Sequence, residues 1–193
     1  DALFDGKKSF HSETERPNPL NAYAETKVLA ENVVKTLVDY AIIRTNFYGF
    51  NIVGKQSFSE WLYRKLSQGE EVPAFNDFFF SPIEATSLCT ALLELASHDF
   101  TGVLNVAGDC RLSKYDFAIE FAREFGFDSS LVKPTKMREA LLKARRPSDC
   151  SLDVSEAKKL LKAKVPGVKD GIVQYKNLLE QGYSNKLRGF SNG

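Results

Sequence analysis

Residues 21–49 read NAYAETKVLAENVVKTLVDYAIIRTNFYG, and this stretch decides the class of fold. Asn21 is a good helix N-cap, and apolar residues recur at helical spacing from there to about residue 38. After a short turn, residues 41–45 have the length and the β-branched content of a buried parallel strand. A helix with a short connection into a buried strand is half of a β-α-β unit, so the stretch predicts an α/β fold.

The remainder of the chain also alternates between helical and strand patterns. Apolar residues at helical spacing predict helices near residues 57–68, 84–96, 113–125 and 168–179. Short apolar runs predict strands at residues 71–74 and 102–108, and a strand or a tight loop at residues 78–82. Residues 153–156 (DVSE) have capping-box spacing ahead of a short helix. The pattern is α/β throughout, with late residues that form a small lobe.

The composition is that of a globular protein without a strongly charged partner. The chain has 193 residues, of which 43% are hydrophobic and 26% charged, and its net charge is +1. This balance suits a packed core and argues against nucleic acid or an anionic membrane as a partner. No apolar run approaches the ~18 residues of a membrane-spanning helix, and no signal peptide is evident.

Cysteine and histidine are too few and too scattered for a metal site. Cys89, Cys110 and Cys150 include no C-x-x-C pair, and the only histidines are His11 and His98. We therefore expect no metal centre. An odd, scattered set of cysteines fits a reducing compartment, which predicts a cytoplasmic protein.

Tyr23 and Lys27 are the first candidates for chemistry. Residues four apart lie on one face of a helix, so the phenol and the ammonium are neighbours in the first turn. A nearby ammonium favours the phenolate form of a tyrosine, which equips it as an acid or base near neutral pH. Spacing alone is also what an ordinary surface pair would show.

The context of this pair resembles one family over nearly the whole chain. Residues 13–27 (ETERPNPLNAYAETK) are similar to the "E-x-x-P-x-NPLN-x-Y-G-x-(S/T)-K" segment of extended short-chain dehydrogenases/reductases of the dTDP-4-dehydrorhamnose reductase branch. Residues 43–49 (IRTNFYG) resemble the "IRT-S-W-x-Y-G" of that branch. Residues 144–147 (ARRP), with the later Leu152-Asp153, resemble its "A-x-RP…L-D". Residues 5–6 and 81–82 match further short motifs of the branch.

The resemblance implies a fold and domain limits. It implies the carboxy-terminal part of a Rossmann-type doubly wound parallel sheet with a small α/β substrate-binding lobe. Residues 1–56 would be the remainder of the NAD(P)-binding domain, 57–182 the substrate lobe with the last Rossmann elements, and 183–193 a frayed tail. The chain has no glycine-rich phosphate loop, which we expect upstream with the amino-terminal half of the domain. The chain alone is therefore not expected to bind a dinucleotide well or to be active.

The resemblance also implies roles for the Tyr–Lys helix and the strand that follows it. Tyr23 would protonate the sugar oxygen as hydride reaches the 4-keto carbon, and Lys27 would hold the nicotinamide ribose hydroxyls. Thr45 and Asn46 would line the cofactor site, although an ordinary turn role for Asn46 is equally compatible. The cofactor would be NADPH or NADH.

Three residues would contact the substrate. Phe47 would offer a flat apolar surface to a 6-deoxy sugar, unless it is a core residue below the sheet. Arg145 and Arg146 would bind the nucleotide diphosphate, unless they are solvated surface residues. Arg44 follows a buried-strand pattern, so we expect a structural ion pair there rather than a ligand contact.

The leading hypothesis is NAD(P)H-dependent reduction of the 4-keto group of a dTDP-linked 6-deoxy sugar, as in dTDP-rhamnose biosynthesis. Two alternatives stay open. One is a sugar-nucleotide epimerase or dehydratase of the same superfamily. The other is a non-catalytic subunit that resembles the regulatory subunit of methionine adenosyltransferase. The nucleotide sugar is the expected partner, and the resemblance leaves a homodimer open.

Overall fold

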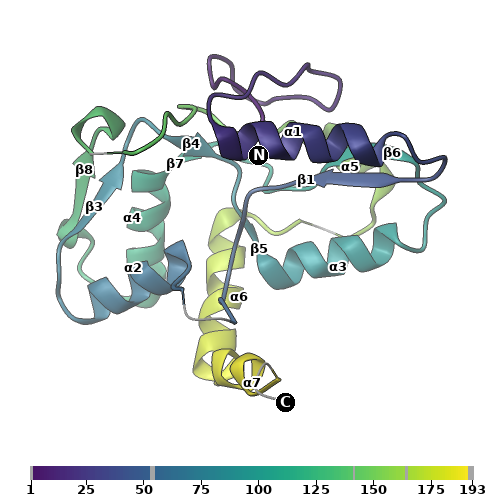
Figure 1. Ribbon diagram of the computed structural model, residues 1–193. Coiled ribbons are helices and arrows are strands. Elements are labelled where there is room, and N and C mark those ends of the chain that lie inside the picture. Colours follow the sequence, from purple (N-terminus) through teal and green to yellow (C-terminus); the bar gives the residue numbers. More distant parts are fainter. Residues whose placement is uncertain (1, 53–54, 141, 164, 191–193) are drawn as a thin grey trace.

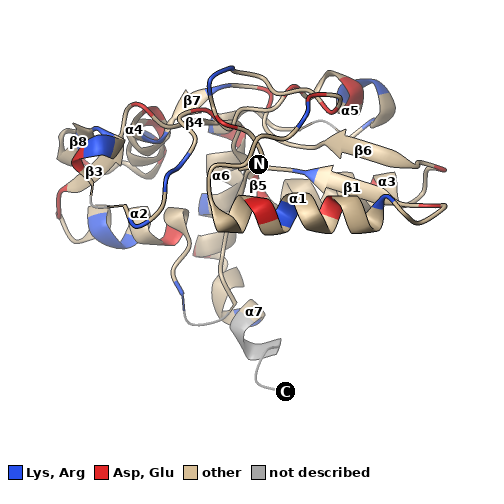
Figure 2. Ribbon diagram, turned by 45° about the horizontal axis from the view of Figure 1, so that its top comes forward, with Lys and Arg blue, Asp and Glu red and all other residues tan. Residues whose placement is uncertain are grey.

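The computed structural model describes residues 2–52, 55–140, 142–163 and 165–190, with side chains in the last helix described up to residue 187. Figure 1 shows two packed parts, a layered α/β part around α1, β1, β6 and α3, and a lobe built on α2, α4 and α6. Figure 2 shows acidic and basic positions alternating along α1 and mixed over the other elements. None of the helices within the described ranges has the length and apolar character needed to cross a membrane.

The layered part holds two of the strands that the sequence predicts, and the structure pairs them in parallel. Strand β1 (Ala41–Arg44) pairs in parallel with β6 (Gly102–Asn105), with Ala41 opposite Gly102 and Arg44 opposite Asn105. Helix α1 (Ala22–Val34) lies on one side of β1, and α3 (Ala85–Leu95) lies on the other (Figure 1). Parallel strands covered by helices on both sides are the arrangement expected for a doubly wound sheet.

The other strands are short and also form pairs. Strand β2 (Phe47–Tyr48) is parallel to β5 (Ile83–Glu84), and β3 (Val72–Phe75) is parallel to β8 (Val132–Thr135). Strand β4 (Phe79–Phe80) is antiparallel to β7 (Leu112–Ser113). Strand β8 has no apolar run to predict it, because its sequence is VKPT.

The lobe has an aromatic core organised by α4 (Lys114–Phe125). Ser113 caps this helix with Asp116 in a capping box, and the left-handed Gly126 ends it. Helices α2 (Phe58–Ser67) and α6 (Val168–Glu180) pack against the same core. The fully buried rings at its centre come from α4 and α6 and are Phe117, Phe121 and Tyr175.

A second apolar cluster lies between α3 and β6. It contains Leu88, Ala91 and Leu95 from α3 and Leu104 from β6. The short helix α5 (Ser155–Leu160) closes this cluster with Ala157. This cluster therefore packs β6 against α3, with Ile43 of β1 partly buried beside it.

The predicted cap of α5 does not form as a capping box. The helix begins after Val154, which makes no side-chain cap. Asp153 instead accepts hydrogen bonds from the backbone and the hydroxyl of Ser155, at 2.9 and 2.5 Å. The Asp153 carboxylate thus forms a local turn with Ser155. This turn replaces the hydrogen bond to the backbone of Glu156 that a capping box would need.

The expected frayed tail is also not what the structure shows. Residues from Tyr183 to Phe190 form helix α7, while residues 191–193 lie outside the described residues. The ring of Tyr183 lies 6.1 Å from that of Phe50, which anchors the start of this helix.

The loop before α1 is bound to a segment that is distant in sequence. His11 donates its backbone N–H to the carbonyl of Ser151 at 2.9 Å, and the Ser148 hydroxyl donates to the carbonyl of Gly6 at 2.8 Å. Gly6 has φ +72°, and a Cβ there would lie 2.5 Å from the backbone nitrogen of Ser148. Only glycine permits this approach, which brings residues 144–150 beside the first turn of α1.

Candidate active site

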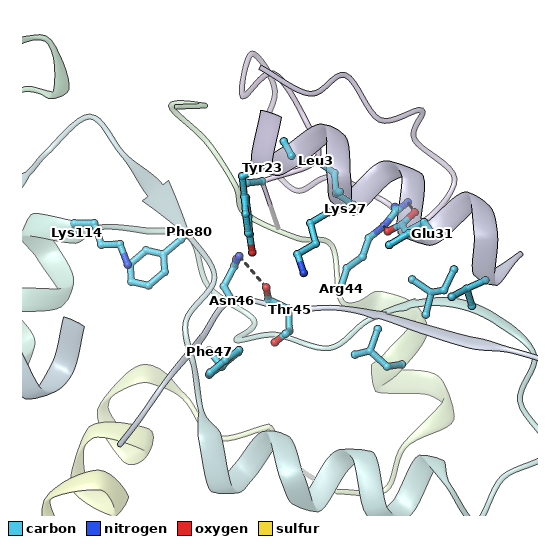
Figure 3. Close-up of a pocket in the computed structure, with 16 residues that line it drawn as sticks. Leu3, Tyr23, Lys27, Glu31, Arg44, Thr45, Asn46, Phe47, Phe80 and Lys114 are labelled. Atoms are coloured by element: carbon cyan, nitrogen blue, oxygen red, sulfur yellow. Dashed lines mark hydrogen bonds and ion pairs between the residues drawn. The ribbon is translucent and has the colours of Figure 1, made fainter. Parts of the chain in front are cut away.

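Tyr23 and Lys27 lie together in the first turns of α1 and face a pocket of ≈ 450 Å³ (Figure 3). Asn21 starts the helix by accepting a hydrogen bond from the backbone N–H of Ala24 at 2.9 Å. The ammonium of Lys27 lies 5.5 Å from the centre of the Tyr23 ring. Within the described ranges, no hydrogen bond or ion pair reaches the Tyr23 hydroxyl or the Lys27 ammonium, and 63% of Tyr23 is exposed.

The carboxyl end of β1 forms the floor of this pocket through Thr45, Asn46 and Phe47. Asn46 is buried, and its side-chain oxygen accepts the backbone N–H of Ser81 at 2.9 Å. Its amide nitrogen lies 3.3 Å from the carbonyl of Thr45. Figure 3 shows the Tyr23 hydroxyl pointing toward Asn46. Asn46 therefore fixes the strand end below Tyr23, so its first role is structural.

Phe47 is a pocket residue and not a core residue. It is 65% exposed, whereas its neighbour Tyr48 is only 4% exposed. Residues next to each other in a strand point to opposite faces, so burial of Tyr48 in the lobe turns Phe47 outward. The alternative of a core phenylalanine is excluded.

Arg44 forms the structural ion pair that the sequence predicts. Its Nε and Nη2 atoms donate to the two carboxylate oxygens of Glu31 on α1, each at 2.8 Å. Both residues are buried. Burial raises the pKa of Glu31, but the hydrogen bonds and charge of Arg44 outweigh this, so the pKa of Glu31 lies below its ordinary value. The pair joins α1 to β1 directly behind the catalytic candidates.

The structure gives Arg145 and Arg146 different surroundings. The carbonyl of Arg145 accepts a hydrogen bond from the Asn21 side chain at 2.8 Å, which ties this segment to the helix cap. Arg146 lines a cleft together with Tyr23 and Phe78, whereas Arg145 lines none of the described pockets. Both side chains are exposed. Arg146 is therefore the better placed of the two for a ligand near Tyr23.

Lys114 lines the same pocket, and sequence reasoning missed it. It is the first residue of α4, and its half-buried side chain ends among the rings of Phe58, Phe78 and Phe80. Burial, and to a smaller extent Arg146, lowers the pKa of Lys114 to about 7. In sequence, a lysine that follows a helix-capping serine is expected to be exposed to solvent. No local pattern therefore predicts that Lys114 lines a pocket.

The uncommitted groups of the pocket fit the ribose end of a nicotinamide cofactor. The Thr45 hydroxyl is buried and has no hydrogen-bond partner among the residues described. Together with Lys27 and Tyr23 it offers donors and acceptors for the hydroxyls of a sugar. The chain supplies no glycine-rich turn for a pyrophosphate, so its residues fit one end of the cofactor only.

Fold and site together define a Rossmann-type α/β protein with a Tyr–Lys pair at the carboxyl end of its parallel strands. The family model "RmlD substrate binding domain" matches residues 1–180. The chain belongs to this family, and the predicted family and fold class are confirmed.

Two curated relatives show the range of the family. The probable low-salt glycan biosynthesis reductase Agl14 of Haloferax volcanii is 29% identical over 180 residues, covering 89% of this chain and 59% of the relative. Methionine adenosyltransferase 2 subunit beta of Danio rerio is 25% identical over 164 residues, covering 80% of this chain and 50% of the relative. The chain thus spans only part of the length of both.

Two solved structures share the fold. The hypothetical dTDP-4-dehydrorhamnose reductase of Sulfolobus tokodaii is 34% identical with a TM-score of 0.77, over 88% of this chain and 59% of that one. The dTDP-4-dehydrorhamnose reductase of Bacillus anthracis, solved in complex with NADP, is 22% identical with a TM-score of 0.81, over 90% and 62%.

Proposed function

We propose that the whole protein reduces the 4-keto group of a nucleotide-linked 6-deoxy sugar with NADPH or NADH. The observation that carries this proposal is the uncommitted pair Tyr23 and Lys27, which faces a pocket at the carboxyl end of β1. Their polar side-chain atoms have no hydrogen-bond or ion-pair partner among the described residues and are therefore available to a ligand in this pocket. The 34% identity to the Sulfolobus reductase supports the substrate class.

Tyr23 is the proton donor in this proposal. The nicotinamide, when bound, supplies the hydride that adds to the carbonyl carbon. The Tyr23 hydroxyl gives its proton to the carbonyl oxygen, and the phenolate that remains is stabilised by the Lys27 ammonium on the next turn. Lys27 also holds the ribose hydroxyls, with the unpartnered hydroxyl of Thr45 as an additional contact. Asn46 keeps the strand end in place through Ser81.

The substrate would be held by Phe47 and by the arginine segment. Phe47 presents a flat exposed ring at the pocket, which suits the apolar face of a 6-deoxy sugar. Arg146 lies in the cleft beside Tyr23, where a guanidinium can bind diphosphate oxygens. Arg145 would contribute mainly through its backbone link to Asn21.

A second candidate function is that of a non-catalytic subunit. The match to methionine adenosyltransferase 2 subunit beta favours it, because that relative is 25% identical over 80% of this chain. A subunit of this kind would not need an uncommitted Tyr–Lys pair, so turnover separates the two candidates.

The test is oxidation of NADPH and of NADH by the whole protein with dTDP-4-keto-6-deoxy-L-mannose. We expect turnover with at least one cofactor and a reduced sugar as product. If folded protein that binds dinucleotide gives no turnover with either cofactor, the reductase assignment is wrong and the subunit hypothesis gains.

A further inference from the structure

Lys114 ends in a cage of aromatic rings. Its Nζ atom lies 3.5 Å from the centre of the Phe80 ring and 4.4 Å from that of Phe58. The ring of Phe78 is 5.7 Å away. The rings come from two segments, because Phe58 begins α2 whereas Phe78 and Phe80 belong to the stretch that forms β4. Ring faces attract a cation, so the cage holds the ammonium in one place.

No anion neutralises this ammonium within the part of the chain that the structure describes, and this sets it apart from comparable cations. Arg111 lies 3.6 Å from the Phe79 ring, but it also binds Asp149 at 2.6 Å. Arg44 lies over Phe4 at 5.4 Å and is paired with Glu31. Lys176, near the Phe125 ring, donates instead to the backbone carbonyl of Glu124 at 3.1 Å. Each of these cations therefore has a polar partner, whereas the Lys114 ammonium has none among the residues described. The lack of a carboxylate beside the Lys114 ammonium, among the residues described, points to an anion that a ligand supplies.

The position of Lys114 indicates which part of a ligand it would meet. Lys114 and Phe80 line the pocket that holds Tyr23 and Lys27. Figure 3 shows the Lys114 side chain on the far side of Phe80 from Tyr23. The neighbouring cleft, which Tyr23 also lines, contains Arg146, and Arg146 acts electrostatically on Lys114. Two cations therefore line adjoining pockets beside Tyr23, near enough to act on each other.

We propose that Lys114 is a substrate-binding residue that contacts, together with Arg146, the diphosphate of the substrate. The proposal rests on the proposed function, because it assumes a nucleotide-linked sugar in the pocket. It assigns to Lys114 a contact that neither its position in the sequence nor the Tyr–Lys pair predicts.

This contact makes substrate affinity depend on pH, and the direction follows from the groups around the cage. Without ligand, burial and Arg146 lower the pKa of Lys114 to about 7. An arginine does not titrate in this range, and burial raises the pKa of Cys150 to about 11, so its thiol stays neutral. Asp149 is engaged by Arg111 and Ser151. A bound anion stabilises the ammonium, so affinity is full below pH 7 and falls above it as the lysine must take up a proton to bind.

The test is calorimetric titration of the whole protein with dTDP-glucose from pH 6 to 8.5. This probe carries a diphosphate diester that does not titrate there, and it has no 4-keto group to react. For the unaltered protein we expect Kd to rise by up to about tenfold per pH unit above pH 7. Lys114→Met should weaken binding by about tenfold or more at pH 6.5 and make Kd nearly independent of pH. Lys114→Arg should restore binding but not the pH dependence.

Lys176→Met is the matched control. Lys176 also lies near a ring, 5.7 Å from that of Phe125, but it is remote from the pocket and donates to a backbone carbonyl. This variant should keep the affinity and pH profile of the unaltered protein. Thermal unfolding followed by circular dichroism shows whether Lys114→Met is folded, and Lys114→Arg tests the inference if it is not.

The outcomes separate this inference from the proposed function. If Lys114→Met, or Lys114→Arg where the former does not fold, binds dTDP-glucose with the affinity and pH profile of the unaltered protein, the role of Lys114 is wrong while the reductase proposal stands. If the unaltered protein binds neither dTDP-glucose nor UDP-glucose at any pH, the substrate class itself is wrong and the inference falls with it.

Discussion

Helices α1 and α4 have nearly the same length but opposite relations to the core. Of the 13 residues of α1, only Ala24 and Glu31 are buried, whereas the 12 residues of α4 bury Phe117, Ala118, Phe121 and Ala122. Val28 of α1 packs against the cluster that contains Leu3 and Phe4, but Leu29 and Val33 face outward and are 63% and 68% exposed. Helix α4 holds the lobe together through extensive packing. Helix α1 is held by its cap, one buried ion pair and little apolar packing, and it presents Tyr23 and Lys27 to the pocket.

Truncation of a core ring should show this difference most strongly. Phe121→Ala removes a fully buried ring from α4 and should lower the free energy of unfolding by about 3–5 kcal/mol. Leu29→Ala in α1 should change it by less than about 0.5 kcal/mol, because the side chain is already exposed. Urea unfolding followed by circular dichroism measures both. Equal losses would mean that something covers Leu29 in solution.

Removal of the charge that anchors α1 should have the next largest effect. Glu31→Gln leaves Arg44 buried without a carboxylate, so the free energy of unfolding should fall by about 3 kcal/mol at pH 7. Glu25→Gln, on the exposed face of the same helix, is the control and should change it by less than about 0.5 kcal/mol.

The ion pair of Glu31 and Arg44 also makes the stability of the fold depend on pH. The pKa of Glu31 in the folded protein lies below its ordinary value of 4.5, because Arg44 outweighs the effect of burial. The stabilisation by the pair is therefore complete above pH 4.5 and is lost as the pH falls through the lower folded-state pKa. In unfolding curves measured from pH 3 to pH 7, Glu31→Gln should flatten this acidic limb. If Glu31→Gln loses stability at acidic pH as steeply as the unaltered protein, other carboxylates cause that loss.

The smallest effect on stability is expected at Phe47. Phe47→Ala should change the free energy of unfolding by less than about 0.5 kcal/mol, because the ring is 65% exposed. We expect KM for the sugar nucleotide to rise by about fivefold or more, as the ring would lose its contact with the sugar. Steady-state kinetics alongside the unfolding curve checks both. A large loss of stability would show that Phe47 packs against other residues.

Sequence reasoning succeeded where the signal is local. The cap at Asn21, the strand that carries Arg44 and the pair Tyr23 and Lys27 all lie within one stretch, so spacing and family resemblance together predict them. Periodicity also predicted the apolar stripe of α1, but it cannot say whether anything covers that stripe. The structure leaves Leu29 exposed.

The missed features depend on contacts between distant segments. Lys114 becomes distinctive only when Phe58 and Phe80 are brought around it, and they are 56 and 34 positions away in the sequence, counted from residue 114 to residues 58 and 80. Strand β8 forms because β3 offers it an edge, not because its own residues favour a strand. Arg145 and Arg146 look equivalent in sequence. Contacts with distant residues distinguish them, because the carbonyl of Arg145 accepts from Asn21 whereas Arg146 lines the cleft with Tyr23.

The role of Tyr23 as proton donor can be measured by single-turnover kinetics of Tyr23→Phe with saturating NADPH and dTDP-4-keto-6-deoxy-L-mannose. We expect a rate about 10²–10⁴ times slower than that of the unaltered protein, with the affinity for NADPH changed by less than about threefold. Tyr40→Phe, at the opposite end of β1, should react at the unaltered rate. A Tyr23→Phe rate within about threefold of the unaltered protein would rule out Tyr23 as the proton donor.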